Sequence, residues 1–226
     1  MDKCAIVTGS SSGLGLEITK SLLDSGFVVF GGSRSGTDLE HDNFYDVELD
    51  ISSEESVEEF FDTVREFAPQ VHLVVNNAGI CEMSSISEMS AEIFEEHLAI
   101  NTLGPFLLFK NLESFLIPNE THVISILSTA AHYGYPNVSG YNASKFGQLG
   151  FLQSLKKEWK DHKVKFTNLY PGAIDTPLWD KMGTKFSRDK MLKVSDFMSV
   201  FNFIVSAPKN IQFPEITFLH REGYLE

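Results

Sequence analysis

The sequence lacks most features that mark secreted, metal-binding or membrane-spanning proteins. Its two cysteines in 226 residues, Cys4 and Cys81, have neither the spacing of metal ligands nor that of a disulfide framework. The opening apolar run CAIVTG is too short for a signal-peptide core and has no basic lead-in. No other apolar run approaches the length of a membrane span. We therefore expect a cytoplasmic protein with no metal site and no membrane partner.

Positive charge is scarce as well. Lysine and arginine together number 18 against 31 aspartates and glutamates, which gives a formal net charge of -13. A field of this sign disfavours broad binding to nucleic acid, so we expect no nucleic-acid partner. An anionic ligand would need a local site that overcomes the overall charge.

What the sequence does contain is a regular alternation of two patterns. Short runs rich in β-branched residues alternate with longer stretches of helical periodicity, such as 53–67, where apolar residues recur every three or four positions. The β-branched runs are 4–8, 27–30, 44–50, 71–75, 121–127, 164–170 and 215–219. This alternation predicts one doubly wound α/β domain of the Rossmann type over residues 1–226, with a seven-stranded, mostly parallel sheet and helices on both faces.

One stretch, 173–195, fits neither pattern. It places Trp179, Met182 and Phe186 between charged residues, so that these three side chains look exposed. Long irregular segments of this kind commonly cover binding sites, and we interpret it as a mobile substrate lid.

The first predicted strand runs into the glycine-rich segment TGSSSGLG (8–15), and a helix follows. Gly9, Gly13 and Gly15 let the backbone turn tightly and approach a ligand closely. The N–H groups and the positive dipole end of the following helix favour a pyrophosphate. The alternative is a merely flexible turn, which its position after the first strand of a βαβ unit makes the weaker interpretation.

A second polar pattern is the pair Tyr141 and Lys145. Residues four apart lie on one face of a helix, so these two could present a hydroxyl and an ammonium to one pocket. A nearby positive charge should lower the tyrosine pKa from its usual value near 10 and fit the group for proton transfer. Taken alone, a pair of this kind is more often a helix surface, and a lone serine such as Ser128 is more often a strand-end cap.

Together the motifs resemble those of the short-chain dehydrogenase/reductase family. In chain order they are TGSSSGLG (8–15), NNAG (76–79), the set Asn101, Ser128, Tyr141 and Lys145, and PG (171–172) with Thr176 four residues after the glycine. The resemblance implies hydride transfer between a nicotinamide cofactor and a carbonyl or secondary alcohol. It also implies that Tyr141 is the acid/base, that Ser128 positions the substrate oxygen, that Lys145 holds the nicotinamide ribose, and that Asn101 holds a water linking Lys145 to solvent.

The same resemblance predicts the cofactor-binding residues. They comprise Gly9, Ser11, Ser12, Gly13, Leu14, Gly15, Ser33, Arg34, Asp50, Ile51, Asn77, Ala78, Gly79, Tyr141, Lys145, Pro171, Gly172, Ile174 and Thr176. Asp50 could instead, or in addition, cap the helix that begins near Ser53.

Residues after the second predicted strand bear on cofactor choice. An NAD site carries an acidic residue there for the ribose 2′-hydroxyl, whereas this chain has Ser33 followed by Arg34. A guanidinium suits a 2′-phosphate, so we predict a preference for NADP(H) over NAD(H), which the same site could also take. The alternative is that Arg34 is a solvated surface charge.

For the substrate, a small-molecule carbonyl or alcohol, the candidate contacts are Ser128, His132, Tyr135 and Trp179, although His132 could instead be a loop residue beside Tyr133. We expect a homodimer formed through the helices that carry Asn101 and Tyr141, with 146–155 supplying an apolar face, and a tetramer with less support. Two other functions remain open: a cofactor-sensing regulatory protein, and an epimerase or dehydratase that uses the cofactor transiently.

Overall fold

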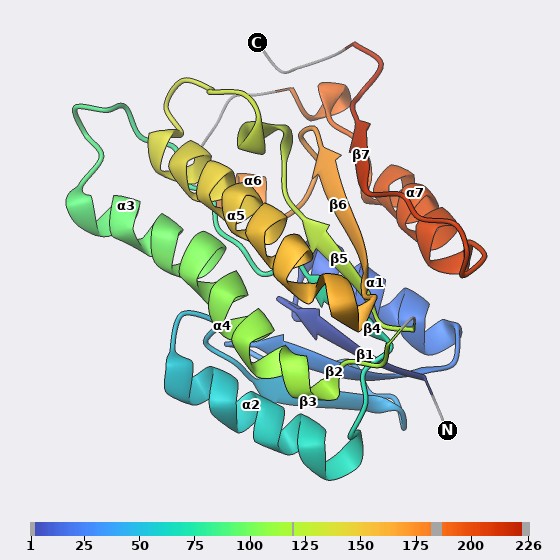
Figure 1. Ribbon diagram of the computed structural model, residues 1–226. Coiled ribbons are helices and arrows are strands. Elements are labelled where there is room, and N and C mark those ends of the chain that lie inside the picture. The colour runs from blue at the N-terminus through green and yellow to red at the C-terminus, as the bar shows by residue number, and fades with distance from the viewer. Residues whose placement is uncertain (1–2, 119, 182–186, 223–226) are drawn as a thin grey trace.

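The computed structural model describes residues 3–118, 120–181 and 187–222, and its centre is a seven-stranded sheet (Figure 1). The strands lie in the order β3-β2-β1-β4-β5-β6-β7, and all six neighbouring pairs are parallel. Their bounds are β1 Lys3–Thr8, β2 Phe27–Ser33, β3 Phe44–Glu48, β4 Leu73–Asn76, β5 His122–Ile126, β6 Lys165–Pro171 and β7 Glu215–Phe218. The predicted doubly wound fold and its seven strands are confirmed, with each boundary within two residues except the end of β2, which lies three residues later than predicted.

Helices cover both faces of the sheet, as Figure 1 shows. Their bounds are α1 Gly13–Asp24, α2 Glu54–Phe67, α3 Ala91–Leu98, α4 Gly104–Leu112, α5 Ser139–Glu158, α6 Leu178–Lys181 and α7 Val194–Ser206. Apolar side chains of α1 and α7 pack on one face, and those of α2, α4 and α5 pack on the other. A π-helical turn, Ala99–Leu103, joins α3 to α4.

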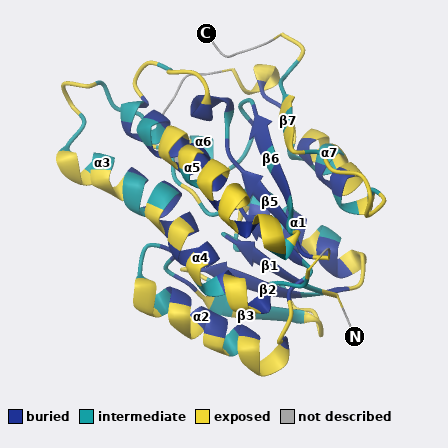
Figure 2. Ribbon diagram, viewed as in Figure 1, coloured by how far each residue is buried: buried dark blue, intermediate teal, exposed yellow. Residues whose placement is uncertain are grey.

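Helix α2 shows how the sequence pattern becomes packing. Val57, Phe60, Phe61 and Val64 are buried, while the acidic residues between them face solvent (Figure 2). Ser53 caps the helix by accepting a hydrogen bond from the Ser56 N–H at 3.3 Å. The predicted periodicity therefore corresponds to one buried stripe.

The order of the strands determines where a ligand can bind. Connections leave β1 toward β2 on one side and β4 toward β5 on the other, so the crevice opens beyond the carboxyl ends of β1 and β4. The glycine turn (8–15) follows β1, and NNAG begins at the end of β4. Within the described ranges, each helix is too short or too polar to cross a lipid bilayer.

Candidate active site

A cavity of about 1010 Å³ lies at this crevice. Most of the predicted site residues line it: Gly9, Ser11, Ser12, Gly13, Leu14, Ser33, Arg34, Asp50, Ile51, Asn77, Ala78, Gly79, Ser128, Tyr135, Tyr141, Lys145, Pro171, Gly172, Ile174, Thr176 and Trp179. Gly15, Asn101 and His132 do not line it. The chain thus brings segments 163 residues apart, from Gly13 to Thr176, around one space.

The glycine turn needs its glycines for two different reasons. Gly9 and Gly13 have φ values of +71° and +54°, which side-chain-bearing residues rarely adopt. Gly15 is needed for contact instead, because a Cβ there would lie 2.0 Å from the carbonyl oxygen of Gly9. Gly15 therefore sets the packing of α1 on the turn rather than touching a ligand.

The start of α1 is built to receive an anion. Its N-cap, Ser12, makes no side-chain capping hydrogen bond, and its first turn contains no acidic residue. The first N–H groups of the helix then remain for a ligand at the positive end of the helix dipole. This arrangement fits a pyrophosphate.

At the end of β2 the cavity is lined by hydroxyls and one guanidinium. Ser33 is 6% exposed, and among the described residues its Oγ has no hydrogen-bond partner. Ser35 Oγ donates to Ser11 Oγ at 3.3 Å, and both residues line the cavity beside Arg34. Within the same ranges, no carboxylate lies within 4.0 Å of Arg34. An orphaned buried hydroxyl next to an unpaired cation fits a phosphorylated ribose.

Asp50 is not the cap of α2, because Ser53 fills that position. Its Oδ1 accepts hydrogen bonds from the main-chain N–H of Ser52 at 3.0 Å and from Ser52 Oγ at 2.6 Å. The Ser52 hydroxyl is the main cause that lowers the pKa of Asp50, and the charge of Arg34 lowers it further. Asp50 therefore shapes the turn before α2 while its carboxylate faces the cavity.

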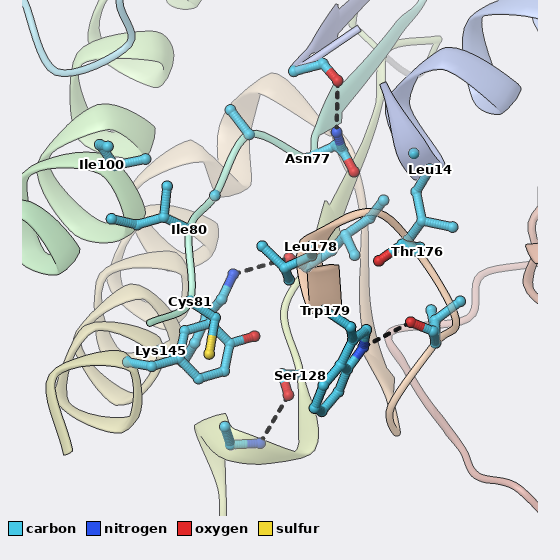
Figure 3. Close-up of a pocket in the computed structure, with 18 of the residues that line it drawn as sticks. Leu14, Asn77, Ile80, Cys81, Ile100, Ser128, Lys145, Thr176, Leu178 and Trp179 are labelled. Atoms are coloured by element: carbon cyan, nitrogen blue, oxygen red, sulfur yellow. Dashed lines mark hydrogen bonds between the residues drawn. The ribbon is translucent and has the colours of Figure 1, made fainter. Parts of the chain in front are cut away.

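The NNAG segment is tied directly to the glycine turn. Asn77 Nδ2 donates to the carbonyl oxygens of Thr8 at 2.8 Å and Gly9 at 3.3 Å. Thr8 Oγ1 in turn accepts from the N–H groups of Asn77 and Ala78 at 3.1 and 3.0 Å. The carboxyl ends of β1 and β4 are thereby held in one fixed relation beside the cavity (Figure 3).

The proposed reacting side chains come from α5 and the end of β5. Tyr141 lies in the first turn of α5, and Lys145 Nζ is 5.7 Å from the centroid of its ring. Lys145 is 4% exposed and donates to the Ile126 carbonyl at 3.3 Å and to Gln148 Oε1 at 3.1 Å. Ser128 Oγ accepts from the Ala130 N–H at 3.1 Å, so its own proton is left for the side of the cavity where its hydroxyl also interacts with Tyr141. Figure 3 shows Ser128, Cys81 and Lys145 close to one another in the pocket.

The expectation that Lys145 lowers the pKa of Tyr141 is wrong for this structure. Burial raises the pKa of Tyr141, the neighbouring Cys81 raises it further, and only Ser128 opposes them. Although an edge of the tyrosine stays open to the cavity, most of the phenol is enclosed, and an enclosed phenolate loses its hydration. Burial also lowers the pKa of Lys145, to about 8, which weakens it as a source of positive charge. Tyr141 is thus held as the proton-bearing phenol.

Asn101 lies behind the cavity wall, in the π-helical turn between α3 and α4. Its Oδ1 accepts from the Ile80 N–H, and its Nδ2 donates to the Ile80 carbonyl, both at 2.9 Å. The second Nδ2 proton goes to Ser144 Oγ at 2.9 Å. The side chain therefore ties the segment after β4 to α5, and the predicted water beside it stays a prediction.

The substrate end combines predicted and unpredicted residues. Tyr135 lines the cavity and its hydroxyl donates to Thr129 Oγ1 at 3.0 Å. His132 points elsewhere, with its ring 4.4 Å from that of Tyr170, because the loop after β5 turns it onto β6. Asn142, which sequence reasoning missed, holds this loop by donating to the Ala130 and Tyr133 carbonyls at 3.0 and 2.6 Å.

The predicted lid is only partly described. Trp179 lines the cavity but is half-buried rather than exposed, and its Nε1 donates to the Ile174 carbonyl at 2.9 Å. Arg188 forms ion pairs with Asp175 and Asp180, both at 2.5 Å. Met182 and Phe186 lie outside the described residues, and mobility of the segment stays a prediction.

Two further residues were missed by sequence reasoning. Ser35 was overlooked because a serine in a polar loop carries no signal of its own. Gln148 did have a recognisable signal in the sequence, because it is a polar residue on the apolar stripe of α5, three positions after Lys145. In the described ranges, no group of three or more histidine, cysteine, aspartate or glutamate side chains is arranged to hold a metal ion.

Comparison with known proteins agrees with this geometry. The family described as short chain dehydrogenase matches residues 3–186. A 3-amino-tetrahydro-pyrrolizinone reductase from Xenorhabdus hominickii is 32% identical over 183 residues, which cover 79% of this chain and 64% of that protein. The aligned region thus spans less than two thirds of that relative's length.

Two solved structures share the whole fold. An alcohol dehydrogenase from the archaeon Thermococcus sibiricus, complexed with 5-hydroxy-NADP, has a TM-score of 0.89 at 27% identity and full coverage of both chains. A 3-ketoacyl-(acyl-carrier-protein) reductase from Brucella melitensis, complexed with NADH, has a TM-score of 0.85 at 25% identity and 97% coverage of both. The cofactor in the first structure carries a 2′-phosphate that the cofactor in the second lacks.

Proposed function

Because the chain belongs to the short-chain dehydrogenase family, we propose that it is an NADP(H)-dependent oxidoreductase that interconverts a small-molecule carbonyl and the corresponding secondary alcohol. The observation that carries this proposal is the convergence of Ser128, Tyr141 and Lys145 on one cavity with the anion-receiving turn of α1. When bound, the nicotinamide would supply or accept the hydride.

The side chains of the protein account for the proton and the orientation. Tyr141, held protonated by burial, would donate its proton to the carbonyl oxygen in reduction and take it back in oxidation. Ser128 would donate a hydrogen bond to the same oxygen, since its Oγ already accepts from Ala130. Lys145 keeps a third N–H after its two bonds to Ile126 and Gln148, and this donor would hold the nicotinamide ribose.

Replacing one hydroxyl tests the mechanism. Tyr141→Phe should lower kcat by at least about a hundredfold, because general acid catalysis contributes at least that factor, while NADPH binding by fluorescence titration survives. Tyr45→Phe is the matched control, since Tyr45 stacks on Phe30 away from the cavity and should leave kcat unchanged. Retained turnover in Tyr141→Phe would exclude this role.

The reaction class is tested with wild-type protein and a panel of ketones, quinones, pterins and acyl thioesters. Net NADPH oxidation supports the reductase. Conversion of a substrate without net change in cofactor would indicate an epimerase or dehydratase instead. Tight NADPH binding with no conversion across the panel would favour a cofactor-sensing regulatory protein.

The preference for NADP(H) is supported by the unpaired Arg34 and the orphaned Ser33 hydroxyl. Arg34→Ala should raise the NADPH dissociation constant by about 10- to 100-fold, which is the worth of a charge-assisted hydrogen bond, and leave that for NADH nearly unchanged. Arg65→Ala, on α2 and outside the cavity lining, is the matched control. Equal effects of Arg34→Ala on both cofactors would refute the assignment.

A homodimer is our proposal for the assembly. Leu103, Phe106 and Phe146, from the turn before α4, α4 and α5, are 44%, 44% and 47% exposed and would be covered by a second copy. Phe146→Glu should then yield a monomer by light scattering, while Phe203→Glu, an exposed phenylalanine on α7, should not. A wild-type monomer would contradict the proposal.

We also propose a reducing, cytoplasmic setting. The support is the low cysteine content, because Cys4 and Cys81 are the only two cysteines in the sequence and their spacing is not that of a disulfide framework.

A further inference from the structure

Gln148 occupies an unusual position for an amide. It lies on α5 one turn after Lys145, it is 1% exposed, and its helix neighbours Leu149, Leu152 and Leu155 belong to the apolar core. A buried amide is unfavourable unless its polar atoms are bonded. The bond that Gln148 makes is to Lys145 Nζ, at 3.1 Å.

In the hydrogen bond between Lys145 and Gln148, Lys145 is the donor. An ammonium group has three donors and no acceptor, so the oxygen of the Gln148 amide must be the atom that faces it. The second donor of Lys145 goes to the Ile126 carbonyl at 3.3 Å. Two fixed acceptors, one from α5 and one from β5, leave the third N–H a single direction, which is toward the cavity that Lys145 lines (Figure 3).

Both acceptors, the Gln148 amide oxygen and the Ile126 carbonyl oxygen, are neutral, so they leave the positive charge of Lys145 in place. In the described part of the chain no carboxylate lies within 4.0 Å of Lys145. A carboxylate at position 148 would cancel the positive charge, and an apolar side chain would leave a buried ammonium with one acceptor fewer. An amide stabilises the ammonium without neutralising it.

We infer that Gln148 is a positioning residue for the reaction: its amide oxygen holds the Lys145 ammonium in place and keeps it protonated. The inference rests on the proposed oxidoreductase function. Titratable side chains that face this region are Tyr141 on α5, Cys81 on the segment after β4 and His97, whose ring faces Tyr141 from α3. Asn101 and Ile126, from the π-helical turn and β5, contribute an amide and a carbonyl that do not titrate.

The test measures the protonation of Lys145 directly. In protein labelled with [13C]lysine, the Lys145 13Cε resonance is assigned by its loss in Lys145→Arg and followed against pH in the folded protein. Gln148→Met, which removes the acceptor at similar size, should lower the Lys145 pKa by about one pH unit. Gln148→Glu should raise it by about one to three pH units, because it places a negative charge on the ammonium.

The matched controls are Gln153→Met and Gln153→Glu, at an exposed glutamine of the same helix. Neither should move the Lys145 titration. In turnover, Gln148→Met should lower kcat by about twofold at pH 7 and about tenfold at pH 9, because a Lys145 pKa that falls by one unit from about 8 changes the protonated fraction by those factors, and it should shift the kcat–pH profile in the direction of the resonance.

Opposite shifts from Gln148→Met and Gln148→Glu, with unchanged Gln153 controls, support the inference. A Lys145 titration that neither variant moves would overturn it. If Gln148→Met does not fold, Gln148→Glu decides alone, because it preserves the size of the side chain and the bond to Nζ. The resonance needs no turnover, so a wild-type protein without reductase activity would refute the proposed function and leave this measurement intact.

Discussion

Gly15→Ala should damage the protein although it places a better helix former in a helix. Alanine is favoured over glycine inside a helix by about 1 kcal/mol. At position 15, however, the new Cβ would lie 2.0 Å from the Gly9 carbonyl oxygen, which is 1.0 Å inside the 3.0 Å limit of real Cβ contacts. Two of the three nearest atoms belong to the Gly9 backbone, which cannot rotate away as a side chain can, and the third is Asn77 Nδ2 at 2.7 Å, so α1 must move away from the glycine turn.

Overpacking of a tight contact costs about 1–3 kcal/mol, and a clash with backbone belongs at the upper end of that range. We expect Gly15→Ala to lower the free energy of unfolding by about 2–3 kcal/mol, or Tm by roughly 4–12 °C for a protein of this size. The displaced turn should also weaken NADPH binding by at least about tenfold, or 1.4 kcal/mol. Thermal unfolding and fluorescence titration measure the two effects.

Gly150→Ala is the control, because it also introduces alanine into a helix. Among the residues that the structure describes, and apart from the backbone of its own helix, nothing lies within 4 Å of a Cβ at Gly150. This variant should gain stability by about 0.5–1 kcal/mol and bind NADPH as the wild type does. A Gly15→Ala protein that matches wild type in Tm and NADPH affinity would refute the steric reasoning.

Two further predictions concern titratable groups. Burial lowers the pKa of His122 to about 3, so the stability that its neutral ring contributes is complete above pH 6.5 and is lost as pH falls toward 3. Urea titration across this pH range measures the free energy of unfolding. This free energy should fall less steeply with pH in His122→Gln than in the wild type, with a difference in slope of at most about 1.4 kcal/mol per pH unit. An identical slope in the two proteins would contradict the buried neutral histidine. Burial also raises the pKa of Cys81 to about 12, so iodoacetamide at pH 7.5 should modify it at least about a thousandfold more slowly than in the urea-unfolded chain, as peptide mass spectrometry would show. Equal rates in the two states would mean that the thiol is not enclosed.

The parts of the protein that the sequence predicts well are those set by local pattern. Strand β6 is visible as an apolar β-branched run, and α2 as apolar residues at three- and four-residue steps. Tyr141 and Lys145 are recognisable because helix geometry fixes their relation before any tertiary contact forms. The positions of these elements therefore follow from residues within one turn or one strand.

What could not be predicted depends on contacts between distant segments. The raised pKa of Tyr141 results first from burial and then from the neighbouring Cys81, which lies sixty positions earlier in the chain. The side chain of His132 turns to Tyr170 because the loop after β5 packs on β6. The π-helical turn at Asn101 has no composition of its own, and its place is fixed by bonds to Ile80 and Ser144. Proximity in sequence says nothing about these environments.

The strongly acidic composition raises the question of how the chain could hold an anionic cofactor. The answer lies in which cations are neutralised. Away from the cavity, lysines and arginines such as Lys20, Arg65 and Lys110 pair with a neighbouring carboxylate. In the cavity, Arg34 and Lys145 have no such pair among the described residues.

The start of α1 adds a third positive element, since its first turn carries no acidic residue. At physiological ionic strength, exposed charges more than about 8 Å away are largely screened, so a ligand in the cavity responds mainly to nearby groups, which are these three elements and lining carboxylates such as Asp50. A net charge of -13 and a site for a phosphorylated dinucleotide are therefore compatible. The overall acidity repels non-specific polyanions, and the three local elements provide the attraction where the cavity needs it.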